Sequence, residues 1–92
     1  MSKVYISAAR RTAVGSFLGT LKDVPAAELS TAVIKQVLED SHLKGEQIDE
    51  VVFGNVLSAG TKQGMTRQAS VNAGIPIEVP AYGVDMLCGS GM

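Results

Sequence analysis

Apolar residues recur at intervals of three to five positions in the stretch that follows residue 25, and this spacing predicts one long amphipathic helix. The apolar positions are Leu29, Val33, Ile34, Val37 and Leu38. Pro25 suits the first position of the helix, and Asp23 just upstream is a possible cap. Because Gly45 can adopt the left-handed conformation that ends a helix, we expect the helix to end between Ser41 and Gly45.

Three short apolar runs predict β-strands. Residues 3–9 are rich in β-branched and aromatic side chains, residues 51–57 are almost continuously apolar, and residues 81–87 alternate in character. Between the last two runs, residues 65–74 fit a short helix closed by Gly74. The order strand, helix, strand, helix, strand predicts an α/β fold of two β-α-β units, with parallel strands, right-handed crossovers and helices packed on the sheet.

Composition and charge narrow the class of protein and of partner. A chain of 92 residues, 46% hydrophobic and 18% charged, has room for one small folded domain. Its formal net charge of −1 gives no electrostatic reason to expect nucleic acid or an anionic membrane as a partner. No apolar run approaches the ~18 residues of a membrane span, and the N-terminal residues lack the apolar core of a signal peptide.

The chain contains one cysteine, Cys88. A single cysteine excludes an internal disulfide framework and favours a reducing compartment, so we expect a cytoplasmic protein. Cys88 stands in the segment VDMLCGSGM, directly after the third predicted strand. In parallel α/β sheets, ligands and catalytic groups gather at the carboxyl ends of the strands, where the next helix begins.

A helix that begins at Cys88 would favour the thiolate over the thiol, and a thiolate is the nucleophile that acyl transfer needs. Gly89 and Gly91 leave space for an acyl group, and the backbone amide of Cys88 could donate to an oxyanion. The alternative is that Cys88 only fills buried space, with Gly-Ser-Gly as an ordinary turn. The spacing alone leaves both interpretations open.

The segment VDMLCGSGM resembles the nucleophile segment of the thiolases, and of the acetyl-CoA acetyltransferases in particular. Three further stretches resemble thiolase segments in the same order and spacing: AARRTAVGSFLGTL, VVFGNVLSAG and TRQASVNAGIP. The resemblance implies that residues 1–92 are the N-terminal part of a thiolase N-domain, with the nucleophile at the end of the third strand. The sheet would be incomplete, and the remainder of the N-domain and the whole C-domain would be absent.

The resemblance also implies a reaction and a set of partners. A full-length thiolase of this kind would condense two molecules of acetyl-CoA to acetoacetyl-CoA, reversibly, through an acetyl group on Cys88. Acetyl-CoA and coenzyme A would be substrates, and no metal or redox cofactor is implied. A histidine base and a second catalytic cysteine would lie in the C-terminal half of a thiolase, so this chain alone would be inactive. Assembly as a homodimer or homotetramer is implied as well.

Two alternatives to this function remain open at the level of sequence. The first is a degradative 3-ketoacyl-CoA thiolase or a related condensing enzyme, because acyl-chain preference is set mostly outside these residues. The second is a non-catalytic interaction fragment.

Asp85 departs from the thiolase pattern, in which Asn is more usual three residues before the cysteine. A carboxylate in a buried strand needs a partner, and an ionised one close to Cys88 would oppose the thiolate.

Other polar residues have simpler interpretations. His42, the one histidine, falls at the end of the first predicted helix, where we expect it to face solvent and not to act as the base. Arg10 and Arg11 end the first predicted strand, and we expect them to be solvated or salt-bridged there and not to bind coenzyme A.

Thiolases dimerise through the region that corresponds to the loop and short helix before the third strand. In this chain that region contains Gln63, Met65 and Arg67. Part of it would therefore be a subunit interface. A capped surface helix with Met65 in the core fits the residues equally well.

Overall fold

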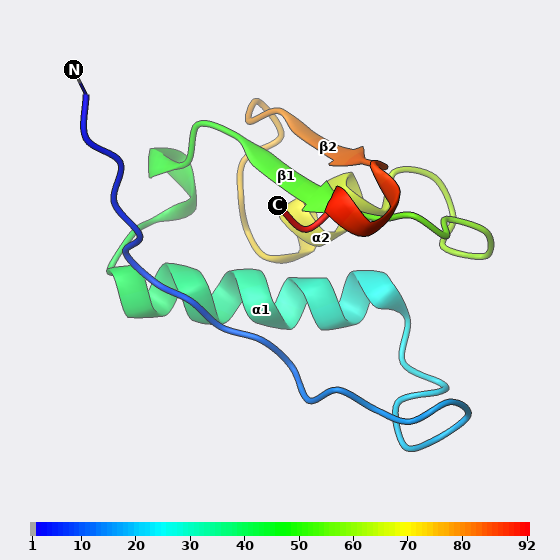
Figure 1. Cartoon of the computed structure of the whole chain (residues 1–92). Coiled ribbons are helices and arrows are strands. Elements are labelled where there is room, and N and C mark those ends of the chain that lie inside the picture. The colour runs from blue at the N-terminus through cyan, green and yellow to red at the C-terminus, as the bar shows by residue number, and fades with distance from the viewer. Residues whose placement is uncertain (1) are drawn as a thin grey trace.

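A computed structural model describes residues 2–92 as two helices and a two-stranded parallel sheet (Figure 1). The helices are α1 (Ala26–Ser41) and α2 (Met65–Asn72), and the strands are β1 (Val51–Gly54) and β2 (Ala81–Val84). Two single turns of 3-10 helix complete the order, η1 (Gly45–Gln47) before β1 and η2 (Leu87–Gly89) after β2. The fold is therefore α/β, as the pattern predicts.

The first helix forms where its apolar spacing predicts, and Ile34 is its buried residue. The helix ends at Ser41, inside the predicted range, but the residues that cap its two ends differ from the predictions. Pro25 occupies the N-cap without a side-chain hydrogen bond, so Asp23 does not cap the helix. At the other end His42, not Gly45, takes the left-handed conformation, with φ of 56°. Gly45 is needed for another reason, because a Cβ there would lie 2.7 Å from the carbonyl oxygen of Gly74.

The two strands pair in parallel, and α2 forms the crossover between them. The register sets Val51 beside Ala81 and Gly54 beside Val84. Both strands are shorter than the predicted runs, because the pairing ends with a single bond from the Asn55 amide to the Val84 carbonyl at 3.0 Å. A parallel pair with a helical crossover is the β-α-β unit that the sequence predicts for this half of the chain.

The strand predicted over residues 3–9 is absent from the structure, so the predicted β-α-β-α-β order is wrong at its first element. Val4, Tyr5 and Ile6 are 94%, 79% and 88% exposed. The segment crosses over α1 as an extended tube, apart from the sheet (Figure 1). A strand needs a neighbour to satisfy its amide and carbonyl groups. Within residues 2–92 the sheet consists of β1 and β2 alone, so strand propensity here has nothing to pair with.

The core lies between α1, α2 and one face of the sheet. Its buried apolar residues are Ile34, Val51, Ala69, Ile75 and Val79. Helix α2 is the central element, since it contacts α1 on one side and both strands on the other. Gly74, with φ of 91°, ends the α2 segment in the conformation predicted for it. No helix among residues 2–92 combines the length and the apolarity needed to cross a membrane.

Candidate functional site around Cys88

Cys88 is exposed, and it lies in η2, the turn that follows β2. Within residues 2–92 Cys88 therefore does not fill buried space. The position after a parallel strand is the one predicted, although the strand ends at Val84 and not at Leu87. The helix expected to begin at Cys88 is a single 3-10 turn in the described residues. A turn of three residues has no appreciable dipole, so a helix dipole gives the thiol no support here.

A side-chain hydroxyl closes the turn around Cys88. Ser90 Oγ accepts a hydrogen bond from the Met86 amide at 2.8 Å and donates one to the Leu87 carbonyl at 2.8 Å. These two bonds, called the Ser90 bridge below, join the residues on both sides of the cysteine. Backbone bonds of 3.0 Å from the Gly89 amide to Met86 and from the Ser90 amide to Leu87 add to them. The thiol therefore projects from a backbone that is held on either side.

Leu87, next to the cysteine, has the left-handed φ of 50°. For a bulky residue this conformation is uncommon and costs about 1–2 kcal/mol, so the surroundings must hold it. Asp85 contributes to this, because its Oδ1 accepts a hydrogen bond from the Leu87 amide at 3.1 Å. The expectation of Asp85 as a carboxylate in a buried strand is wrong, since it is exposed and lies one residue beyond β2.

The end of β1 supports the turn from behind. A Cβ on Gly54 would lie 2.4 Å from the carbonyl oxygen of Ser90 and 2.7 Å from its carbonyl carbon. Real Cβ atoms do not approach backbone this closely, so glycine is required there. The sequence gives no local signal of this contact, because the two residues are far apart in the chain and Gly54 simply ends an apolar run.

Two features of the turn suit acyl transfer to sulfur. The thiol is accessible, and the Cys88 amide donates to no group within residues 2–92, which leaves it available to an oxyanion. At Gly91 a Cβ would meet nothing within 4 Å, so a side chain could be accommodated there within residues 2–92. Among the same residues no group of three or more His, Cys, Asp or Glu side chains could hold a metal ion.

The histidine is not a partner of this cysteine. His42 is exposed at the end of α1, well apart from the red turn that carries Cys88 (Figure 1). Its predicted place at a solvent-facing helix end is confirmed.

Arg10 forms a salt bridge with Asp40 of α1, with 2.5 Å between Nε and Oδ2, in agreement with the predicted salt-bridged role. The Arg10 hydrogen bond holds the pKa of the Asp40 carboxyl below its ordinary value, and Asp40 in turn raises the pKa of Arg10.

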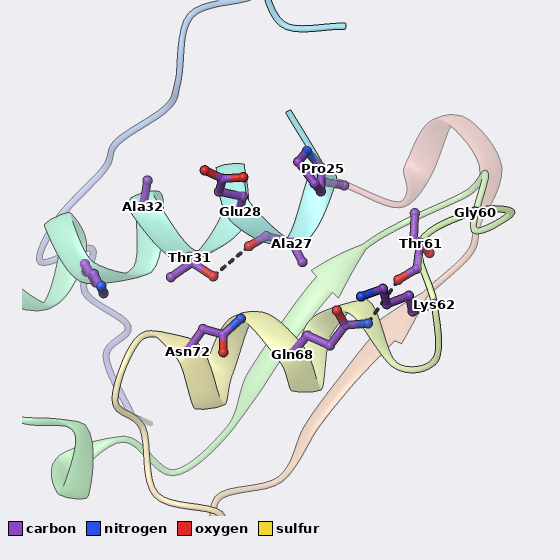
Figure 2. Close-up of a pocket in the computed structure, with 12 residues that line it drawn as sticks. Pro25, Ala27, Glu28, Thr31, Ala32, Gly60, Thr61, Lys62, Gln68 and Asn72 are labelled. Atoms are coloured by element: carbon purple, nitrogen blue, oxygen red, sulfur yellow. Dashed lines mark hydrogen bonds between the residues drawn. The ribbon is translucent and has the colours of Figure 1, made fainter. Parts of the chain in front are cut away.

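Two hollows lie outside the turn. The larger, about 600 Å³, opens between α1, α2 and the loop at residues 60–62, with Glu28, Lys62 and Asn72 among its walls (Figure 2). Cys88 does not line it. The smaller, about 220 Å³, lies at the carboxyl ends of β1 and β2, and its lining includes Asp85 and Arg67.

The region expected at a subunit interface is partly buried and partly open. Met65 is 7% exposed and packs in the interior, as the surface-helix interpretation requires. Arg67 reaches along the surface, where Nη1 donates to the Ile77 carbonyl at 3.3 Å. Gln63 is exposed, and its carbonyl accepts from Gln68 at 2.9 Å. Arg67 and Gln63 can therefore meet another molecule, whereas Met65 cannot.

Comparison with known proteins gives a consistent result. The family model described as thiolase, N-terminal domain, matches residues 4–92. A mouse protein named acetyl-CoA acetyltransferase, cytosolic, is 54% identical over 89 residues, which are 97% of this chain and 22% of the mouse protein. An acetyl-CoA acetyltransferase of Pseudomonas aeruginosa is 51% identical over 92 residues, 100% of this chain and 23% of that protein.

A solved structure has the same fold. The Acat5 thiolase of Ascaris suum, crystallised in complex with coenzyme A, superposes with a TM-score of 0.80 at 36% sequence identity. The match covers 83% of this chain and 20% of the Ascaris chain. This chain therefore spans about a fifth of the length of the proteins that it matches.

Proposed function

This chain belongs to the thiolase family, and on that premise we propose that the protein containing it is an acetyl-CoA acetyltransferase whose acyl carrier is Cys88. The proposed reaction condenses two molecules of acetyl-CoA to acetoacetyl-CoA and free coenzyme A, reversibly. The observation that carries the proposal is the exposed thiol on the turn after a parallel strand, next to a backbone amide that donates to no group within residues 2–92. The names of the acetyl-CoA acetyltransferases that it resembles support the choice of substrate.

In the first half-reaction, the Cys88 thiolate attacks the carbonyl carbon of acetyl-CoA. A new carbon–sulfur bond forms, the bond to the coenzyme A sulfur breaks, and the coenzyme leaves with the proton that Cys88 gave up. The negative charge that develops on the carbonyl oxygen is stabilised by a hydrogen bond from the Cys88 amide. Acetyl-Cys88 and free coenzyme A are the products of this step.

In the second half-reaction, a second acetyl-CoA loses a proton from its methyl group. The resulting carbanion attacks the carbonyl carbon of acetyl-Cys88, a carbon–carbon bond forms, and the Cys88 sulfur leaves as thiolate. Two proton-transfer groups are needed, one to activate Cys88 and one to deprotonate the second acetyl-CoA. In the proposal both lie in thiolase sequence beyond residues 1–92, which agrees with the isolated position of His42.

The proposed assembly is a homodimer or homotetramer, with the loop and helix around Gln63 and Arg67 at the interface. Arg67 is available for this role because its guanidinium lies on the surface. Arg67→Glu should reverse the charge there and weaken the dimer, so we expect a slower-sedimenting species on dilution. Unchanged sedimentation would remove this face from the interface. The single cysteine and the cytosolic mouse relative support a cytoplasmic location.

The experiment that tests the proposed function uses the natural protein that contains residues 1–92, with any sequence that flanks them. It is incubated with acetoacetyl-CoA and coenzyme A, and in parallel with a longer 3-ketoacyl-CoA, and acetyl-CoA release is measured. Rapid cleavage of acetoacetyl-CoA that is lost in Cys88→Ser supports the proposal. A strong preference for the longer substrate would point to a degradative thiolase, and no cleavage of either would point to a non-catalytic interaction role.

A further inference from the structure

The backbone on both sides of Cys88 is held by side chains as well as by the two backbone bonds of a single 3-10 turn. The Ser90 bridge joins the Met86 amide to the Leu87 carbonyl through one hydroxyl, at 2.8 Å on each side. The carboxylate of Asp85 fixes the Leu87 amide at 3.1 Å. Both peptide groups of Leu87 are therefore bonded to side chains, and the second of them, the Leu87–Cys88 peptide, carries the Cys88 amide.

We propose that Ser90 and Asp85 are positioning residues for Cys88 and that they set the direction of its thiol and amide for acetyl transfer. This inference rests on the function proposed above. Leu87 holds a left-handed φ of 50°, which bulky residues seldom adopt without support. Without the Ser90 bridge, Leu87 can relax toward an ordinary conformation, and this rotation turns the Cys88 amide and side chain away from the substrate.

The position of Ser90 is itself fixed from outside the turn. Its carbonyl oxygen lies against Gly54, where a Cβ would come within 2.4 Å. The end of β1 therefore blocks movement of the turn toward the sheet, and the Ser90 bridge restrains it within its own backbone. Neither contact reaches the open side of the turn, where Cys88 is exposed. For this reason we expect the two side chains to affect the rate of acetyl transfer and not the affinity for acetyl-CoA.

The role of Asp85 requires an acceptor oxygen and no negative charge. An Asn side chain presents the same oxygen to the Leu87 amide, whereas Ala presents none. Asp85→Asn should therefore restore acetyl transfer relative to Asp85→Ala. This pair separates positioning from an effect of charge on the thiolate, because a charge effect would make the Asn and Ala variants alike.

The test compares Ser90→Ala, Asp85→Ala and Asp85→Asn in the natural protein that contains this chain. Ser16→Ala is the matched control, because Ser16 is exposed and its hydroxyl forms no hydrogen bond within residues 2–92. Single-turnover formation of acetyl-Cys88 is followed by mass spectrometry over a range of acetyl-CoA concentrations. Hydrogen exchange of the Met86 amide is measured on the same proteins.

We expect Ser90→Ala and Asp85→Ala to slow acetylation by on the order of 10–100-fold at saturating acetyl-CoA, while the concentration for half-maximal rate stays within about twofold. Exchange of the Met86 amide should accelerate in Ser90→Ala only. Asp85→Asn should acetylate at least about tenfold faster than Asp85→Ala. Acetylation of Ser90→Ala at the unsubstituted rate, or unchanged Met86 exchange, would overturn the positioning role and leave the proposed function standing. No acetyl-Cys88 in the unsubstituted protein would overturn both.

Discussion

Gly54 is the position where one added methyl group should disturb the turn around Cys88 most. In Gly54→Ala the new Cβ would stand 2.4 Å from the Ser90 carbonyl oxygen and 2.7 Å from its carbon. Both are backbone atoms, so no rotation of a side chain relieves the overlap. Ordinary contact begins near 3.4 Å, and the turn must therefore retreat from β1 by about 1 Å.

The expected magnitudes follow from that displacement. Overpacking of this kind costs about 1–3 kcal/mol of unfolding free energy. Without the overlap, alanine in a strand would be more stable than glycine by about 0.5–1 kcal/mol, because glycine loses more backbone entropy on folding. A net loss of stability is therefore informative, since propensity alone predicts a gain. A nucleophile misplaced by about 1 Å lowers the rate of its reaction by on the order of 100-fold.

The assay combines urea unfolding with single-turnover acetylation of Cys88 in the natural protein. Gly15→Ala is the matched control, because its nearest contact is the flexible end of Leu21 at 3.3 Å. We expect the control to keep the acetylation rate and to keep or slightly raise the unfolding free energy, because alanine restricts the unfolded chain more than glycine does. If Gly54→Ala matched the control in both measurements, the argument that β1 fixes the turn would be refuted.

Three further predictions concern single side chains. Ser70 is fully buried, and its Oγ has no hydrogen-bond partner among residues 2–92. Ser70→Ala should therefore raise the unfolding free energy by about 1 kcal/mol, and a loss of stability in urea unfolding would mean that the hydroxyl is bonded after all. The Arg10 hydrogen bond lowers the pKa of Asp40, so this pair stabilises the fold above the ordinary carboxyl pKa, and the stabilisation is lost as pH falls through the folded-state pKa. Asp40→Asn should therefore make the unfolding free energy depend less on pH in this acid range. An unchanged dependence on pH would show that the pair does not cause it. The hydrogen bond from Tyr82 to Glu50 raises the pKa of Tyr82, so the contact stabilises the fold below the ordinary tyrosine pKa, and the stabilisation is lost as pH rises through the folded-state pKa. Glu50→Gln should move the ultraviolet titration of the Tyr82 phenol to lower pH. An unchanged titration would exclude Glu50 as the cause of the raised pKa.

The elements that the sequence predicts correctly are those fixed by local spacing. Helix α1 follows from the recurrence of apolar side chains, and α2 from a short run that ends at Gly74. The β-α-β unit follows because parallel pairing needs a crossover, and α2 is the segment available between β1 and β2.

The strand expected at residues 3–9 shows where local reasoning fails. Its residues favour an extended backbone, but a strand exists only beside a partner, and propensity does not identify that partner. The end of α1 is a smaller case of the same kind. Gly45 is the residue that best tolerates a left-handed conformation, yet the chain turns three residues earlier, at His42.

The position of the candidate site in the chain could be predicted from the sequence, but the contacts that hold the turn around Cys88 could not. The place of Cys88 follows from a parallel strand that ends just before it, together with the resemblance of VDMLCGSGM to thiolases. The serine of this segment suggested only a turn. Its bonds to Met86 and Leu87, and its contact with Gly54, depend on three-dimensional packing that the spacing of residues does not encode.

The most direct test of the account is whether Cys88 carries the acyl group. The natural protein is mixed with acetyl-CoA in the absence of added coenzyme A, quenched in acid and digested, and the peptide that contains Cys88 is examined by mass spectrometry. We predict a mass increase of one acetyl group on Cys88, removed when free coenzyme A is added back. An unmodified Cys88 in a protein that still condenses acetyl-CoA would contradict the central claim, because the acyl carrier would then be another residue.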